Sequence, residues 1–207
     1  MDNHLETQLR AAKVAGRVLA RLSGVVRAGL VRDVARAVRS ASVSILNANA
    51  VDVASAEASG MHPALVDRLR LSDAKLDGMI LDIEAVAGLA DPIGIHTSLG
   101  VQPSGLSVER VTIPLGVVGV VYESRPNVTT DISALCLRSG NAVILRGGSE
   151  TLHTNRALTS AMCSALGQYS DAVQFIDDVS RERVRELICA DTYIDVIIPR
   201  GGAALGR

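Results

Sequence analysis

Aromatic side chains are almost missing from this sequence, which has three Tyr, one Phe and no Trp among its 207 residues. The core must therefore be built from aliphatic side chains, and a bound ligand cannot depend on ring stacking. Basic segments interleaved with aromatic rings, which bind single-stranded nucleic acid, are absent as well. The formal net charge of −1 also argues against a nucleic-acid partner.

Cysteine and histidine patterns indicate neither a disulfide framework nor a metal site. Cys136, Cys163 and Cys189 form an odd, widely spaced set without a CxxC pair, and the four histidines lack ligand spacing. Cys136 shares an apolar helical face with its neighbours, which favours a core thiol over a nucleophile. We expect the same of Cys163 and Cys189, which lie in amphipathic segments.

Signals for membrane insertion or export are also lacking. No apolar run is long enough to span a bilayer. The first ten residues carry Asp2 and Glu6 and do not resemble a signal peptide. The sequence therefore predicts a cytoplasmic protein without a membrane partner.

Helical periodicity dominates the first part of the chain. Apolar residues recur at helical spacing over 5–22 and again over about 25–58, where Gly60 and Pro63 interrupt the pattern. A further helix is expected after Ser72, a plausible N-cap, and should end at Asp91-Pro92.

The composition and periodicity of the sequence then change. Residues 94–105 are rich in Gly, Pro and Ser and predict a linker. Residues 106–113 alternate as in a strand with one solvent-exposed face. These changes predict three parts: an N-terminal helical region over 1–92, a linker with an edge strand over 93–113, and a cofactor domain over 114–207.

Short apolar runs alternate with helix-like stretches in the last part. The runs predict strands buried on both faces, at 115–122, 142–145, 173–176 and 194–198. The stretches between them predict helices over 128–139, 152–166 and 181–190. This alternation predicts an α/β fold, a Rossmann-like parallel sheet with flanking helices. A further helix is expected from Ala203, and the stop at Arg207 predicts a truncated domain.

Two of the predicted strands end in the same tripeptide. Arg146-Gly147-Gly148 precedes Ser149, and Arg200-Gly201-Gly202 follows the last strand. Carboxyl ends of parallel strands form the binding edge of such sheets, and glycine and helix N-termini let phosphate approach the backbone. We expect both tripeptides on one edge, lining a dinucleotide site. The alternative is that the glycines only form tight turns, and GxGxxG is absent.

Asn127 follows another predicted strand, after Pro126. Two interpretations are open for it. Asn is common as a helix N-cap, and an amide at a strand end can also stabilise an oxyanion. If the second holds, Asn127 should share the edge with Arg146, Gly148 and Gly201.

Several segments resemble glutamate-5-semialdehyde dehydrogenases (gamma-glutamyl phosphate reductases), a family within the aldehyde dehydrogenase superfamily. The segments are PLGVVGVVYESRPNV at 114–128, SGNAVILRGG at 139–148, YIDVIIPRGG at 193–202, ILNAN at 45–49 and LADPIG at 89–94. They occur in the family's order, and the resemblance as a whole extends over nearly the whole chain.

The resemblance implies an NADP(H)-dependent oxidoreductase of proline biosynthesis that reduces L-glutamate 5-phosphate to the semialdehyde. It implies that Asn127 is the oxyanion donor and that Arg146 and Ser149 lie at the adenosine ribose, where a neutral Ser149 accepts a 2′-phosphate. Glu150 adjoins that position and partly opposes this inference. Gly147 and Gly148 with Arg200, Gly201 and Gly202 would line the rest of the cofactor. Strand 106–113 would make homo-oligomer contacts.

The family's nucleophilic cysteine lies in a later glycine-rich segment, so the resemblance also implies that the catalytic domain is absent from these residues. Three hypotheses remain open: part of an active reductase, an NADP-binding fragment without turnover, or a poorly folding remnant. An adjoining segment with a glycine-flanked cysteine favours the first, cofactor binding without turnover the second, and aggregation the third.

Overall fold

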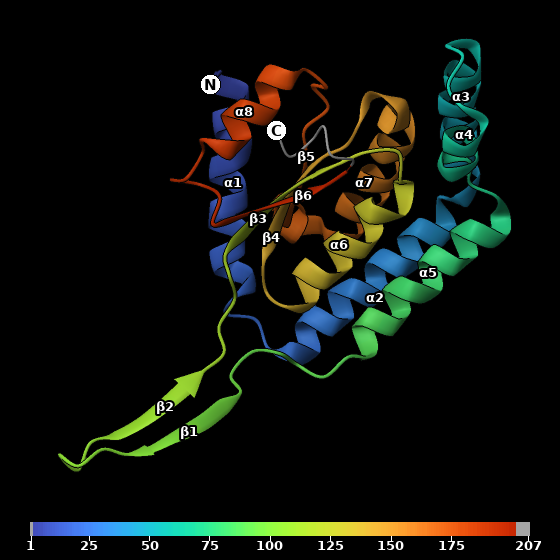
Figure 1. Cartoon of the computed structure of the whole chain (residues 1–207). Coiled ribbons are helices and arrows are strands. Elements are labelled where there is room, and N and C mark those ends of the chain that lie inside the picture. Colours follow the sequence, from blue (N-terminus) through green and yellow to red (C-terminus); the bar gives the residue numbers. More distant parts are fainter. Residues whose placement is uncertain (1, 202–207) are drawn as a thin grey trace.

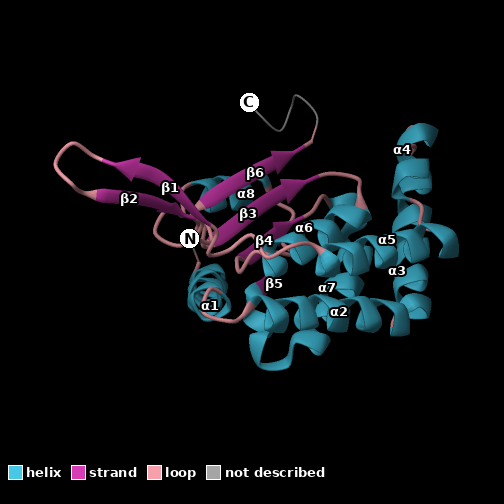
Figure 2. Cartoon of the chain, turned by 90° about the horizontal axis from the view of Figure 1, so that it is seen from below, coloured by secondary structure: helices cyan, strands magenta, loops and turns pink. Residues whose placement is uncertain are grey.

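The computed structural model describes residues 2–201 as helices packed on both faces of a parallel sheet, with a hairpin projecting to one side (Figures 1 and 2). The strands of the sheet are β3 (Val117–Tyr122), β4 (Ala142–Arg146), β5 (Val173–Phe175) and β6 (Val196–Arg200). They lie in the order β5-β4-β3-β6, and every pair is parallel. The predicted α/β class is therefore confirmed.

Two apolar clusters cover the two faces of the sheet. On one face Val118, Val120 and Leu145 pack against α2 (Gly24–Ser40), α5 (Asp73–Gly88), α6 (Pro126–Arg138) and α7 (Leu152–Leu166). On the other face Val117 and Ile144 pack against α1 (Asn3–Leu19) and α8 (Arg181–Ile188). Since successive strand residues point to opposite faces, central strands with a helix layer on each side must be apolar throughout.

The N-cap expected at Ser72 is confirmed. The Ser72 side chain accepts a hydrogen bond from the Lys75 amide at the start of α5. A short helix, α4 (Pro63–Leu69), was not anticipated; His62 caps it and Pro63 occupies its first turn. Two 3₁₀ turns, η1 (Ser149–Thr151) and η2 (Gly167–Ala172), flank α7.

The helix expected over 25–58 is wrong, since the chain forms α2 and α3 (Ser42–Ala58) with a break at Ala41. The Ser42 hydroxyl donates to the Arg39 carbonyl at 2.6 Å, which favours this turn. Both helices pack against α7, but beyond the break α3 also packs against α4, whereas α2 also packs against α5 and α6. The change of direction serves these different contacts.

The expected linker over 94–105 contains β1 (His96–Val101), which pairs antiparallel with β2 (Ser107–Val111). The residues of both strands are exposed except Val108, which is partly buried. The expectation that 106–113 has one buried face is therefore wrong. The hairpin extends away from the body of the protein in both views (Figures 1 and 2).

The expectation of two buried faces is also wrong for β6, which is half-buried at its start and exposed at its end. It is the outermost strand on its side of the sheet, with β3 as its neighbour among the described strands. The helix expected from Ala203 lies outside the described residues. Among the residues that are described, no helix is long and apolar enough to cross a membrane.

Candidate functional site

The carboxyl ends of three parallel strands meet at one edge of the sheet. Arg146 at the end of β4 is in register with Val121, and Arg200 at the end of β6 is in register with Tyr122. Asn127 follows β3 within the first turn of α6. The predicted grouping of Asn127, Arg146, Gly148 and Gly201 at one edge is therefore confirmed, while their roles stay predictions.

A cavity of about 530 Å³ opens at this edge. Its lining comes from the ends of β3 and β4, from α8 and from Met61, and comprises Met61, Glu123, Ser124, Arg146, Gly148, Ser149, Glu150, Val179, Arg181, Val184, Arg185 and Ile188. The volume lies in the range of small-molecule and cofactor sites. Three arginines among the lining residues suit a ligand that carries phosphate.

Arg146 is mostly committed to protein contacts. Its side chain is 7% exposed, and its Nη2 donates to the carbonyls of Val179 and Ser180, at 3.3 Å for the second. Burial lowers the pKa of Arg146, opposed by the charges of Glu150, Asp178 and Glu123. Arg146 thus joins the end of β4 to the loop before α8, and ligand contact through its remaining edge stays a prediction.

The packing around the turn after Arg146 by itself explains a glycine there, apart from the expected ligand contact. A Cβ on Gly147 would lie 2.2 Å from Asn155 Nδ2, so the turn does not admit a side chain there. Gly148 is buried, whereas Ser149 is exposed in η1. The tight-turn interpretation is therefore supported at Gly147, and Ser149 is open to a ligand.

The N-terminus of α7 does not offer the free amides that were expected after Gly148. Asp52 of α3 accepts the amide of His153 at 3.2 Å and that of Thr154 at 2.8 Å. It also accepts the Thr154 hydroxyl at 2.6 Å. The buried carboxylate thus occupies the position that a phosphate would take at a helix N-terminus, and the expectation is wrong for this helix.

Asn127 is not the N-cap of α6, because that position belongs to Arg125 and Pro126 is the first helical residue. Its side-chain Nδ2 donates to Asp131 Oδ2 at 2.9 Å, one turn further along the helix. An amide nitrogen carries two hydrogens, so the second remains for an oxyanion. The capping interpretation is therefore wrong, and the oxyanion interpretation stays a prediction.

Asp131 orients that amide from an unusual environment. Its Oδ1 is buried and accepts no hydrogen bond in the described part of the chain. Burial raises the pKa of Asp131, as does the charge of Asp82, against the hydrogen bond from Asn127 and the charge of Arg200. Arg200 therefore acts on the same carboxyl group as Asn127. Gly201 is exposed at the end of the described chain, and Gly202 lies outside it.

A buried polar chain beneath the edge was missed by sequence reasoning. The Tyr122 hydroxyl and Thr129 Oγ1 are 2.7 Å apart, Thr129 Oγ1 donates to Asn155 Oδ1 at 2.8 Å, and Asn155 Nδ2 donates to Thr151 Oγ1 at 2.9 Å. Burial raises the pKa of Tyr122, so its hydroxyl stays protonated and donates to Thr129. These bonds hold β3, α6 and the turn after β4 together, and only the Thr151–Asn155 spacing was visible locally.

None of the three thiols is placed for nucleophilic attack at this edge. Cys136 is 6% exposed, as expected of a core thiol, and burial raises its pKa to about 12. Burial and the charge of Asp171 raise the pKa of Cys163 to about 11. Cys189 is exposed at the end of α8, contrary to expectation, and it does not line the cavity. Within residues 2–201 no cluster of His, Cys, Asp and Glu could hold a metal.

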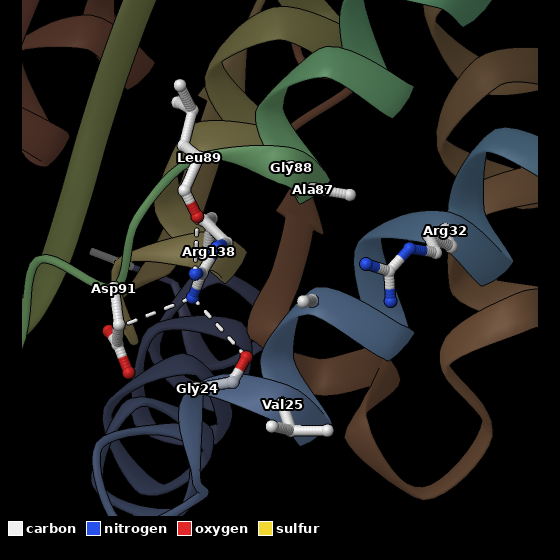
Figure 3. Close-up of a pocket in the computed structure, with 9 residues that line it drawn as sticks. Gly24, Val25, Arg32, Ala87, Gly88, Leu89, Asp91 and Arg138 are labelled. Carbon is white, nitrogen blue, oxygen red and sulfur yellow. Dashed lines mark hydrogen bonds and ion pairs between the residues drawn. The ribbon is translucent and has the colours of Figure 1, made fainter.

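A second cavity, of about 410 Å³, lies between the start of α2 and the end of α5 (Figure 3). The Arg138 guanidinium donates there to the carbonyls of Leu89 at 2.6 Å and Gly24 at 3.3 Å. Asp91, 3.7 Å from Arg138, also pairs with Arg27. These contacts hold α2, α5 and α6 together at the edge opposite the strand ends, so the cavity does not belong to the candidate site.

Comparison with known proteins gives close relatives over the whole chain. It is 50% identical to a gamma-glutamyl phosphate reductase of Escherichia fergusonii over 206 residues, which are 98% of this chain and 49% of the relative. The crystal structure of gamma-glutamyl phosphate reductase from Thermotoga maritima superposes with a TM-score of 0.93 at 38% identity, covering 99% of this chain and 50% of that one. The chain thus spans about half the length of the curated relatives it matches.

A more distant structure shows the fold alone. Betaine aldehyde dehydrogenase from Staphylococcus aureus, solved with NAD⁺, superposes with a TM-score of 0.76 at 18% identity, covering 97% of this chain and 39% of that one. The sheet and its helices therefore have the aldehyde dehydrogenase fold. None of the sequence profiles of known protein families matches the chain.

Proposed function

Because this chain resembles the N-terminal half of gamma-glutamyl phosphate reductases over nearly its whole length, we propose that it is the NADP(H)-binding part of such an enzyme. The reaction is the reduction of L-glutamate 5-phosphate to L-glutamate 5-semialdehyde, in the cytoplasm. The observation that carries the proposal is the arginine-lined cavity at the carboxyl ends of the strands, the edge at which Asn127 follows β3.

In this proposal a thiolate attacks the acyl carbon of the substrate, phosphate leaves, and the resulting thioester is reduced. NADPH, when bound, supplies the hydride. Asn127 donates its free amide hydrogen to the acyl oxygen as negative charge develops there, and Asp131 holds the amide in that orientation. Gly148 and Ser149 would border the bound cofactor, and Arg200 with Gly201 would approach it from the end of β6.

Selection of NADPH over NADH follows from charge at the cavity. Arg181 and Arg185 are exposed, one turn apart on α8, and both line the cavity. Ser149 beside them is neutral. Two acids, Glu123 and Glu150, line the cavity against three arginines, and Glu150 accepts hydrogen bonds from the Ser124 amide and hydroxyl. A 2′-phosphate therefore finds more positive than negative charge.

The nucleophile comes from outside the thiols described above, since the pKa values of Cys136 and Cys163 are raised and Cys189 does not line the cavity. The active enzyme then needs a further segment carrying the catalytic cysteine. The alternative is an NADP-binding fragment without turnover. It is favoured if the native protein has the mass of these residues alone.

We expect the 207-residue chain to bind NADPH weakly but saturably, as measured by NADPH fluorescence. Changing both Arg181 and Arg185 to Gln should weaken NADPH about tenfold, a loss of about 1.4 kcal/mol, and leave NADH almost unchanged. Arg156→Gln is the matched control, because that exposed arginine pairs with Asp177 and does not line the cavity. No binding of either nucleotide to the wild-type chain would refute the proposal.

The same preparation should not reduce NADP⁺ in the presence of glutamate 5-semialdehyde and phosphate. Turnover that survives replacement of all three cysteines by Ser would contradict the thiol mechanism. Turnover abolished by a single replacement would show that the reactive thiol is among the three.

We also propose that the β1–β2 hairpin mediates homo-oligomer contacts. It is a two-stranded sheet with apolar side chains exposed, among them Leu99 (55%), Val101 (70%) and Leu106 (63%), and an isolated hairpin is marginally stable in water. The wild-type chain should self-associate in light scattering, and Val101→Lys with Leu106→Lys should shift it toward monomer. Leu81→Lys, an exposed position on α5 (59%), should have no effect. A monomeric wild-type chain at high concentration would exclude this role.

A further inference from the structure

Ser124, in the turn between β3 and α6, is the one non-glycine residue in the described chain with a positive φ, of 45°. This left-handed conformation is unfavourable for a residue with a side chain, and it persists only where surrounding contacts hold it. The turn matters because Asn127 follows three residues later.

The contact that holds Ser124 comes from the neighbouring turn after β4. Oε1 of Glu150 accepts the Ser124 amide at 2.6 Å and the Ser124 hydroxyl at 2.8 Å. Hydrogen bonds to an ionised carboxylate are about twice as strong as neutral ones. Two of them on one oxygen offset the unfavourable backbone of Ser124.

Gly148 makes room for this carboxylate. A Cβ on Gly148 would lie 2.3 Å from both oxygens of Glu150, so any side chain there displaces the group. The second glycine of the tripeptide therefore serves Glu150 in this structure, as the first serves Asn155. Glu150, Ser124 and Gly148 all line the cavity at the strand ends.

Beyond Asn127, the first turn of α6 is held by Thr129, which bonds Tyr122 and Asn155, and by the Thr130 hydroxyl, which donates to the Asn127 carbonyl; before Asn127, the helix is joined to the Ser124 turn. Its N-cap residue, Arg125, makes no side-chain capping bond. Between Ser124 and Asn127 there remain only Arg125 and Pro126, whose ring fixes φ. A displacement of Ser124 is therefore transmitted to Asn127 through a short and stiff connection.

We infer that Glu150 is a positioning residue for Asn127: it locks the Ser124 turn from the wall of the cavity and so ties the placement of the Asn127 amide to what the cavity contains. The lock itself follows from the contacts above. Its consequence for an oxyanion, and the identity of the ligand, rest on the proposed function.

The test uses ¹⁵N-labelled wild-type chain and Glu150 variants. Glu150→Ala should raise the hydrogen-exchange rate of the Ser124 amide about tenfold or more and shift the side-chain amide signals of Asn127. Glu150→Gln, which keeps an acceptor oxygen, should restore both in part. Ser124→Ala, which removes only the hydroxyl donor, should give an intermediate effect and remains informative if Glu150→Ala does not fold. Unchanged exchange and unchanged Asn127 signals in these variants would overturn the inference.

Two controls separate positioning from general destabilisation. Glu57→Ala removes a partly exposed carboxylate that pairs with Arg70 far along α3, and it should leave Ser124 and Asn127 unchanged. The urea midpoint of Glu150→Gln should match that of Glu57→Ala. A fall in the midpoint with uniform signal changes throughout the sheet would mean a structural role only.

NADPH is the ligand probe. Its addition to the wild-type chain should shift the Asn127 signals, and in Glu150→Ala that shift should be lost at saturating NADPH. An identical Asn127 shift in both proteins would overturn the coupling. If NADPH does not bind the wild-type chain, the proposed function fails. Hydrogen exchange at the Ser124 amide still tests whether Glu150 holds the Ser124 turn, because that measurement needs no ligand.

Discussion

Gly116→Ala is expected to destabilise the protein by on the order of 4 kcal/mol, from backbone strain and a displaced contact together. Gly116 has φ of 119°, a region that residues with a side chain rarely adopt. An added Cβ would lie 2.1 Å from Asp195 Oδ2. That oxygen also accepts the Val117 amide at 2.8 Å, and the carboxylate pairs with Lys13 at 2.8 Å.

Relief of the clash therefore costs the bonds that hold the starts of β3 and β6 to α1. The loss should be read from urea unfolding monitored by circular dichroism. Gly78→Ala is the control, because Gly78 lies in α5 with nothing within 4 Å of an added Cβ. That change should stabilise the protein by about 0.5–1 kcal/mol. Equal midpoints for Gly116→Ala and the wild type would contradict the argument.

Arg27→Met is expected to cost about 2–3 kcal/mol. The Arg27 side chain is 2% exposed, and its Nη2 donates to both oxygens of Asp91, at 2.7 and 2.8 Å. It also donates to the Leu22 carbonyl and, at 3.2 Å, to the Arg138 carbonyl. Methionine keeps most of the apolar volume but leaves these acceptors unpaired. The loss is near the low end for a broken buried pair, since Asp91 is 34% exposed and Arg138 stays nearby.

Arg32→Met is the matched control, because Arg32 is exposed on the same helix (Figure 3), and it should change stability by no more than about 0.5 kcal/mol. A loss as large in Arg32→Met as in Arg27→Met would mean that helix propensity, and not the buried pair, is responsible.

The dependence of the free energy of unfolding on pH, at acidic pH, gives a second measurement of the Arg27–Asp91 pair. Burial pushes the pKa of Asp91 upward, but the Ile93 amide, Arg27 and the charge of Arg138 together hold it below its ordinary value of 3.8. A depressed carboxyl pKa contributes stability that is present above the unfolded pKa and is lost as pH falls through the folded pKa. Without Arg27, this acid-dependent loss should be smaller. The free energy of unfolding between pH 6 and 3 should therefore change less in Arg27→Met than in the wild type.

The sequence by itself determined those features that a single segment can encode. The central strands at 117–122 and 142–146 were visible because both of their faces are buried and every residue must then be apolar. Helix 152–166 was predicted with its observed bounds, and its buried face is apolar at Leu158, Met162 and Leu166 but polar in its first turn, at Thr154 and Asn155. The two Arg-Gly-Gly ends could be assigned to one edge, since parallel strands in one sheet end on the same side.

Weak local signals failed where packing supplied the decisive contacts. The strand at 96–101 mixes polar and apolar residues and is exposed along its whole length, so its pairing with 107–111 defines it. At the break at Ala41, both helices stay in contact with α7, but α2 also packs against α5 and α6 and α3 against α4. The strand at 196–200 resembles its buried neighbours in composition, but its edge position leaves much of it exposed.

Only the tertiary structure decided what the side chains at the candidate site contact. Arg146 bonds carbonyls more than thirty residues away, and Asp52 caps a helix about a hundred residues further along the chain. Glu150 holds Ser124 from the neighbouring turn. Periodicity reports which face of a segment is buried, but not which distant group lies against it. A hydrogen bond is made only within about 3.5 Å, and that proximity arises from the order of the strands and the packing of the helices, neither of which leaves a local pattern.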